Sequence, residues 1–266
     1  MRRALLALIL AGCSGGDDAG ADASAASGDA ARAAVDAAVD VDLDGDGLGD
    51  AAEMELAVAY RPFLSLHPDD DCPLGGVVLR VRPHPDDPAL VHVVYDHLFE
   101  RDCGATGHVG DNEVFAVTID PAEPPPAGIR AIRAIAHQNT PCQKVSECGA
   151  CGDMDACATA PRAGQAWPVV YSSRDKHGSY VSGCQWSCFD VCEIGSGDDP
   201  PMVNVGEPDA HLIDDLTSAG LITEEAGWSE PSLFAIDPWD PDHDFGSAGN
   251  IAGDLTDSAF DTPTCL

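Results

Sequence analysis

The stretch VVLRVRPHPDDPALVHVVY, residues 77–95, decides the fold. It holds two short runs rich in β-branched residues, 77–82 and 90–95, with prolines and aspartates between them. Apolar, β-branched runs that end at turn residues are typical of β-strands. The stretch therefore predicts two strands with an irregular connection.

Further strands are expected outward from this stretch. Residues 113–119 and 168–173 have the same character, and residues 129–137 fit either a strand or a helix. Apolar residues at helical spacing predict a helix over 51–60, which Pro62 ends.

These elements predict a mainly β fold. A second helix is expected over 210–218, between Pro208-Asp209 and Gly220. Short strands with irregular connections and one or two peripheral helices favour an antiparallel two-sheet β-sandwich with disulfide-stapled loops. We expect this domain to span residues 59–266.

The charge of the chain limits its partners. The 266 residues include 46 Asp and Glu but only 13 Lys and Arg, so the formal net charge is −33. Such a protein repels nucleic acids and anionic membranes and attracts cations and positively charged partners. We therefore expect no nucleic-acid partner.

The first residues, MRRALLALILAGCSGG, have the form of an export signal. Two arginines precede an apolar run that is too short to span a bilayer. Its end, Leu10-Ala11-Gly12-Cys13, resembles the lipobox of bacterial lipoproteins, which implies a signal peptide over 1–12 and lipidation of Cys13. By the same resemblance, Ser14 favours the outer membrane or cell surface. An ordinary cleaved signal with an incidental cysteine is the alternative.

A tether is expected over residues 13–40. This segment consists mostly of Gly, Ala, Asp and Ser and cannot form a hydrophobic core. A flexible chain of this length reaches roughly 30 Å. It would hold a folded domain away from the membrane that anchors it.

The cysteine count agrees with export. Without Cys13, ten of the 11 cysteines remain, an even number that favours five disulfides in an oxidising compartment. Zinc ligation by Cys148, Cys151 and the cluster of Cys184, Cys188 and Cys192 is the alternative. The sequence does not determine which cysteines pair.

Residues 41–58 predict a calcium-binding loop followed by a short helix. Read as a twelve-residue EF-hand loop, residues 42–53 have glycine at position 6, where the chain turns sharply. The predicted Ca²⁺ ligands are Asp42, Asp44, Asp46, the backbone carbonyl of Leu48, Asp50 and Glu53. A solvated acidic linker is the alternative.

The glycines of this loop suggest a particular kind of calcium site. Gly45 and Gly49 make it similar to the calcium repeats of thrombospondin type 3 and of related bacterial adhesive proteins. This resemblance implies a structural role instead of a sensor role. A single loop outside the cytoplasm is expected to bind Ca²⁺ weakly, with a Kd on the order of 10⁻⁴–10⁻³ M.

A second group of polar residues lies at a strand start. Asp111 and Glu113 alternate along a strand and therefore share one face, and His108 precedes them. These side chains could bind a divalent cation. His177 lies in a second turn after a strand, although a single histidine at a strand end is more often a hydrogen-bonded residue than a ligand.

Together these segments resemble two families. The necrosis- and ethylene-inducing-peptide-like cytolysins contain Gly-His-x-His-Asp-Trp-Glu and later His-Gly-x-Tyr, which Gly107–Glu113 and His177–Tyr180 match in part. Gly110 replaces the second histidine and Asn112 the tryptophan. The vacuolar protein sorting sixty-two family is similar at Tyr60–Asp69 and at Tyr171–Tyr180.

The resemblance to the cytolysins implies a second cation, Mg²⁺ or Ca²⁺. His108, Asp111 and Glu113 would line its pocket, with Glu100 at the position of a further family ligand and His177 and Tyr180 nearby. In those cytolysins the cation supports binding of a sphingolipid head group.

Three functions are compatible with these features. The first is a non-enzymatic surface lipoprotein that binds a glycan or lipid head group. The second is a metal-dependent hydrolase that uses His108, Asp111, Glu113 and His177, although no common hydrolase motif accompanies them. The third is a purely structural envelope protein.

Overall fold

The computed structural model describes residues 41–204 and 258–260. Within the first range, the undescribed positions are 73, 106, 108, 139, 150–156, 182, 185–187, 196 and 198. The predicted signal peptide with Cys13, the tether and the helix expected over 210–218 lie outside the described residues.

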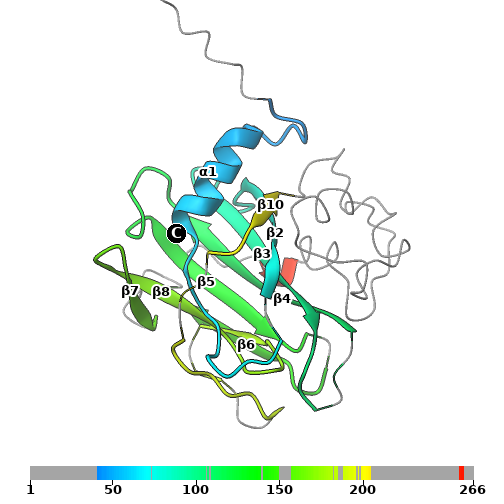
Figure 1. Ribbon diagram of the computed structural model, residues 1–266. Coiled ribbons are helices and arrows are strands. Elements are labelled where there is room, and N and C mark those ends of the chain that lie inside the picture. The colour runs from blue at the N-terminus through cyan, green and yellow to red at the C-terminus, as the bar shows by residue number, and fades with distance from the viewer. Residues whose placement is uncertain are drawn as a thin grey trace, which may run out of the picture. The chain divides into compact units, whose positions relative to one another are not determined.

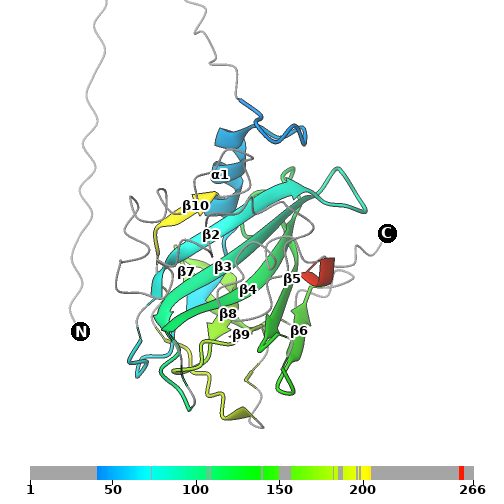
Figure 2. The same ribbon diagram turned by 90° about the vertical axis from the view of Figure 1, so that its right-hand side faces the viewer.

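The larger sheet has six strands in the order β10-β2-β3-β4-β5-β6 (Figure 2). Its strands are β2 (Leu74–Pro83), β3 (Val91–Arg101), β4 (Val109–Ile119), β5 (Ile129–Ala136), β6 (Lys144–Cys148) and β10 (Met202–Asn204). Consecutive strands from β2 to β6 pair antiparallel, whereas β10 pairs parallel with β2 at the edge.

The smaller sheet forms around β8. Its strands are β1 (Phe63–Ser65), β7 (Thr159–Arg162), β8 (Gln165–Ser172) and β9 (Ser179–Tyr180). β1 pairs parallel with β8, and β7 and β9 pair antiparallel with it. The predicted β-sandwich is confirmed, with one parallel pair in each of its two sheets.

The helix α1 (Asp50–Tyr60; Figure 1) precedes β1 in the chain. Two tyrosines fix its end, because the Tyr60 hydroxyl donates to the Glu123 carbonyl at 2.6 Å and the Tyr95 hydroxyl donates to the Ala57 carbonyl at 2.7 Å. A short 3₁₀ helix, η5 (Ser258–Phe260), ends the described part of the chain. Among the described residues, no helix has the length and hydrophobicity to cross a membrane.

One hydrophobic core joins the two sheets. Tyr95 and Phe115 stack with their ring centroids 4.9 Å apart on the large sheet, and Trp167 and Val170 of the small sheet belong to the same buried cluster. Each large apolar side chain that becomes fully buried contributes roughly 1.5–3 kcal/mol. The alternation along β3 also directs Tyr95, His97 and Phe99 to the same face, which extends the core towards the site described below.

Disulfides are confirmed. The described bonds are Cys72–Cys103, Cys142–Cys188, Cys148–Cys157 and Cys184–Cys192. They account for eight of the ten cysteines expected to pair, and Cys151 and Cys265 lie outside the described residues. The zinc alternative is wrong for Cys148, Cys184, Cys188 and Cys192, because their sulfurs are bonded to other cysteines.

Candidate functional site

Three loops are bound together at one end of the sandwich. We call residues 67–72, 101–105 and 173–178 the three-loop surface. The Cys72–Cys103 disulfide joins the first two loops, and the backbone N–H groups of Cys103 and Gly104 both donate to the Asp175 carbonyl at 2.9 Å. Asp175 N–H donates in turn to Asp70 Oδ2 at 3.1 Å. Segments far apart in sequence therefore form one connected surface.

His177 belongs to the third of these loops, and its side chain is fully buried. Its Nδ1 is 2.7 Å from Asp111 Oδ2 on β4, and its Nε2 is 3.4 Å from Asp70 Oδ1. The ring also stacks on Phe99 of β3, with centroids 3.7 Å apart and planes at 2°. Phe99 and Asp111 are directly opposite each other across β3 and β4, so the sheet register places both contacts under one imidazole.

The two carboxylates favour the charged form of this imidazole. Burial lowers the pKa of His177, but hydrogen bonds and charge interactions with Asp111 and Asp70 outweigh it and raise the pKa to about 9. Burial opposes ionisation of Asp70 too, yet its hydrogen bonds with His177 and with backbone N–H groups hold its pKa below the usual value. His177 is therefore a buried imidazolium between two carboxylates at neutral pH.

The backbone around His177 is constrained. Asp175 and His177 have φ angles of 61° and 55°, a region that few non-glycine residues adopt. Asp102, which is buried, accepts from Lys176 Nζ and from Gly104 N–H, the latter at 2.7 Å. These contacts hold the turn that presents His177 to Asp111.

Gly107 closes the loop between β3 and β4. A Cβ atom at this position would lie 2.0 Å from the Asp102 carbonyl oxygen, so a larger residue does not fit without moving the backbone. Lack of space for a side chain therefore explains why a glycine stands at the start of the sequence motif, and no ligand is needed to explain it.

A further buried carboxylate, that of Asp190, contacts the first residue of the same turn. Asp190 accepts from Ser173 Oγ at 2.7 Å and from the Tyr180 hydroxyl at 2.6 Å, and it lies 2.7 Å from His137 Nε2. Burial raises the pKa of Asp190, but these hydrogen bonds lower it by more, so the pKa stays below its usual value. Ser173 bonds to the carboxylate and not to the histidine, so the group lacks the order of a nucleophilic triad.

The residues predicted to bind the second cation interact with different partners in the structure. Asp111 pairs with His177, and Tyr180 pairs with Asp190. Glu113 is buried on β4 opposite His97. Glu100 lies in β3, but its side chain is not described, and His108 is outside the described residues. Their role as metal ligands stays a prediction.

Asp111 faces His177 in the described geometry. Among the described residues, Asp111, Glu113 and His177 do not form a group with the spacing of a metal site, and His108 lies outside the described residues. Within the described part of the chain, Asp42, Asp44 and Asp46 form the only such group, with ligand atoms within 4.8 Å of one another.

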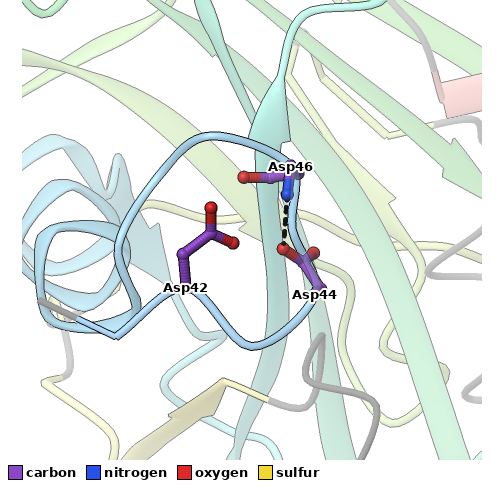
Figure 3. Close-up of side chains that lie close together, drawn as sticks. All are labelled: Asp42, Asp44 and Asp46. Atoms are coloured by element: carbon purple, nitrogen blue, oxygen red, sulfur yellow. Dashed lines mark hydrogen bonds between the residues drawn. The ribbon is translucent and has the colours of Figure 1, made fainter.

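The acidic loop has a compact geometry (Figure 3). Asp42 accepts from the N–H groups of Gly45 and Gly47, and Asp46 accepts from Leu48 N–H at 2.8 Å. Asp46 Oδ2 is buried without a hydrogen-bond partner among the described residues. Partial burial and the charges of Asp44 and Asp42 raise the pKa of Asp46, as expected where a cation would relieve the repulsion.

The last two predicted calcium ligands are engaged with protein groups. Asp50 Oδ1 accepts from Leu43 N–H at 3.2 Å, which closes the loop at the start of α1. Glu53 is buried and accepts from Asn204 Nδ2 at 2.5 Å. The three aspartates fit Ca²⁺ chemistry, and the participation of Asp50, Glu53 and the Leu48 carbonyl stays a prediction.

Sequence reasoning missed Asp70, His137, Phe99 and Asp190. Asp70 directly follows the Tyr60–Asp69 motif, so its position next to a motif residue was a usable signal. Asp190 lies among cysteines and no pattern marks it. Phe99 looks like an ordinary core residue until the strand register is known.

Comparison with known proteins finds only distant structural similarity. No protein-family model and no curated protein matches the sequence. NLPPya in complex with glucosamine is 17% identical, with a TM-score of 0.36 over 64% of this chain and 91% of that chain. NLPPya in complex with mannosamine is 14% identical, with a TM-score of 0.37 over 64% and 91%.

A third similar structure is described as a toxin fold for microbial attack and plant defense. It is 16% identical, with a TM-score of 0.35 over 62% of this chain and 89% of that chain. These neighbours are cytolysin toxins of the necrosis- and ethylene-inducing peptide-like class. The resemblance to the vacuolar protein sorting sixty-two family stays a prediction.

Proposed function

We propose that the protein is an exported, lipid-anchored surface protein whose sandwich binds a glycan or lipid head group without catalysis. The engagement of both His177 ring nitrogens by carboxylates is the observation that carries the non-catalytic part of this proposal. A buried imidazolium held in this way has no free lone pair for a proton or a metal ion. His177 therefore stabilises the three-loop surface from below instead of reacting.

The exposed side chains of this surface suggest the ligand chemistry. Asp69 and Asp71 are exposed on the first loop, Arg101 where β3 runs into the second loop, and Arg174 on the third. Carboxylates and guanidinium groups are hydrogen-bond partners for sugar hydroxyls. With a net charge of −33, the protein attracts ammonium groups. We therefore expect an amino sugar to bind better than its neutral counterpart.

Titration with amino sugars tests this function. Glucosamine and mannosamine, the sugars in the two complexes named above, are the probes, and glucose and N-acetylglucosamine are their neutral counterparts. We expect a Kd on the order of millimolar for the amino sugars, as is usual for one charged contact on an exposed surface. NMR spectra before and after incubation should show the sugar unchanged.

Variants locate the binding surface. Asp69→Asn with Asp71→Asn removes two exposed carboxylates from the three-loop surface and should weaken amino-sugar binding at least fivefold. Asp86→Asn with Asp120→Asn changes the net charge equally elsewhere and should leave the Kd unchanged. Equal weakening by both pairs would show a general charge effect and would overturn the assignment.

The metal-dependent hydrolase is the weaker function on the described geometry. It requires His177 as a ligand or base through one ring nitrogen, and that role would break the bond to Asp111 or to Asp70 at that nitrogen. Sugar turnover that is lost in His177→Gln, with the fold retained, would favour the hydrolase.

Export, anchoring and calcium belong to the same proposal. A lipid on Cys13 would hold the protein at the outer membrane or cell surface, and Ca²⁺ at residues 42–53 would make the start of the sandwich rigid. Mass spectrometry of the mature N-terminus tests the anchor, since a diacylglycerol group on Cys13 is expected and should be absent in Cys13→Ala.

A further inference from the structure

A small pocket lies beside the segment that joins α1 to β1. Its volume is about 80 Å³. The pocket is lined by Arg61, Pro62, Phe63, Leu64, Arg162, Gly197 and Asp199. One water molecule needs roughly 10–15 Å³, so the pocket has room for several waters or for one carboxylate group. Two of only 13 basic residues in the chain meet here.

The positive charge of the buried Arg61 side chain is only partly balanced by its neighbours. Its side chain is 4% exposed, and its Nη2 bonds to Asp199 Oδ1. Its Nε is buried without a hydrogen-bond partner among the described residues. Burial and the nearby charge of Arg162 lower the pKa of Arg61, and Asp199 only partly opposes them. A carboxylate beside this guanidinium therefore stabilises it.

Arg162 is held in position from two sides. Its Nη1 donates to the Arg61 carbonyl at 2.8 Å, and its guanidinium lies 4.7 Å from the centroid of the Trp167 ring. Its Nη2 is 3.5 Å from Asp199 Oδ1, the same oxygen that Arg61 contacts. Two fixed guanidinium groups thus converge on one carboxylate oxygen, an arrangement suited to carboxylate recognition.

The carboxylate they hold is poorly protected. The Asp199 side chain is 83% exposed, whereas Arg61 and Arg162 are 4% and 28% exposed. Because the Asp199 carboxylate is open to solvent, an external carboxylate can compete with it for the same position.

We propose that the Arg61 and Arg162 pocket binds the carboxylate of a small acidic ligand in the position that Asp199 takes. Asp199 is then an internal competitor that keeps the pocket filled. The ligand is a simple carboxylic acid or an acidic sugar such as a uronic acid. This site shares no residue with the three-loop surface, so it does not depend on the proposed amino-sugar binding.

Titration of the full mature chain with glucuronate, acetate and glucose tests this proposal. The indole N–H signal of Trp167 is the reporter, because this ring contacts Arg162. We expect glucuronate to shift the signal with a Kd on the order of 1–10 mM, and glucose to leave it unchanged. If acetate binds as tightly as glucuronate, the pocket recognises the carboxylate alone. If glucuronate binds more tightly, the pocket recognises an acidic sugar.

Variants separate the pocket from general charge effects. Asp199→Asn should tighten glucuronate binding about fivefold or more by removing the competitor, while Asp86→Asn, with the same charge change elsewhere, should not. Arg162→Gln should weaken binding at least about tenfold, and Arg130→Gln on β5 should not. No binding to either wild type or Asp199→Asn, or unchanged binding in folded Arg162→Gln, would overturn the proposal.

Discussion

His177 Nδ1 lies 2.7 Å from Asp111 Oδ2, although the two residues are 66 positions apart in the sequence. The strand β4 supplies the carboxylate, and a turn of the small sheet supplies the imidazole. This contact therefore joins the two sheets of the sandwich through a buried ion pair. Its consequences for stability and for pH dependence can be measured.

Loss of the Asp111 charge should destabilise the protein strongly. In Asp111→Asn the buried imidazolium keeps only its longer contact to Asp70, and removing one member of a buried pair typically costs about 3–5 kcal/mol. Asp120→Asn removes the partner of a more exposed arginine and should cost about 1 kcal/mol or less. Chemical denaturation compares them, and a loss below about 1 kcal/mol in Asp111→Asn would contradict the buried pair.

Stability should decrease as the pH rises above about 6.5. The pKa of His177 is about 9 in the folded protein and near 6.5 when unfolded, so its contribution is complete below pH 6.5 and is lost towards pH 9. The expected loss is on the order of 3 kcal/mol. Denaturation curves at several pH values should show this slope in wild type and a flatter one in His177→Gln.

Stability should also decrease on the acid side, for the opposite reason. Burial lowers the pKa of His92 and of His97 to about 3, so both stay neutral when folded. A lowered histidine pKa gives stability that is present above pH 6.5 and is lost as the pH falls towards 3. His97→Gln should make the free energy of unfolding depend less on pH below 6.5, without changing its dependence above pH 6.5. A change in both pH ranges would contradict the assignment.

Calcium should raise the melting temperature through the acidic loop. With a Kd near 1 mM, about 10 mM Ca²⁺ stabilises the folded state by about 1.4 kcal/mol, which is roughly 3–6 °C. Asp46→Asn should abolish the shift, and Asp86→Asn should retain it. A melting temperature that does not change with Ca²⁺ in wild type would remove the calcium proposal.

The hydrogen bonds to Asp190 should contribute to the stability of the fold. Tyr180→Phe removes one hydrogen bond to a buried carboxylate and should lower the free energy of unfolding by about 1.5–3 kcal/mol. Tyr171→Phe, which alters a tyrosine not bonded to Asp190, is the matched control. Equal effects in the two variants would show that the bond to Asp190 contributes nothing specific.

The sequence predicted the strands better than the sites. The β-branched run at 77–82 lies inside β2, and the helix predicted over 51–60 agrees with α1 within one residue, because local patterns decide these elements. The short strands β1, β6, β7, β9 and β10 were missed, since two to five residues carry too little periodicity. Residues 129–137, left open between strand and helix, contain β5.

The contacts within the site depend on tertiary structure. Alternation along β4 predicted that Asp111 and Glu113 share one face, but it cannot reveal that Phe99 lies opposite Asp111 or that His177 stacks on that ring. The Arg61 and Arg162 pocket had no sequence signal, because 101 positions separate the two residues.

The protonation state of His177 tests the central claim most directly. NMR of the imidazole nitrogens at pH 7.5 should show a proton on both Nδ1 and Nε2 in wild type. The same signals in Asp111→Asn should titrate at a lower pH, because the nearest carboxylate charge is gone. A wild-type ring that has lost a proton at pH 7.5, and titrates near the ordinary histidine pKa, would contradict the buried imidazolium and the non-catalytic role built on it.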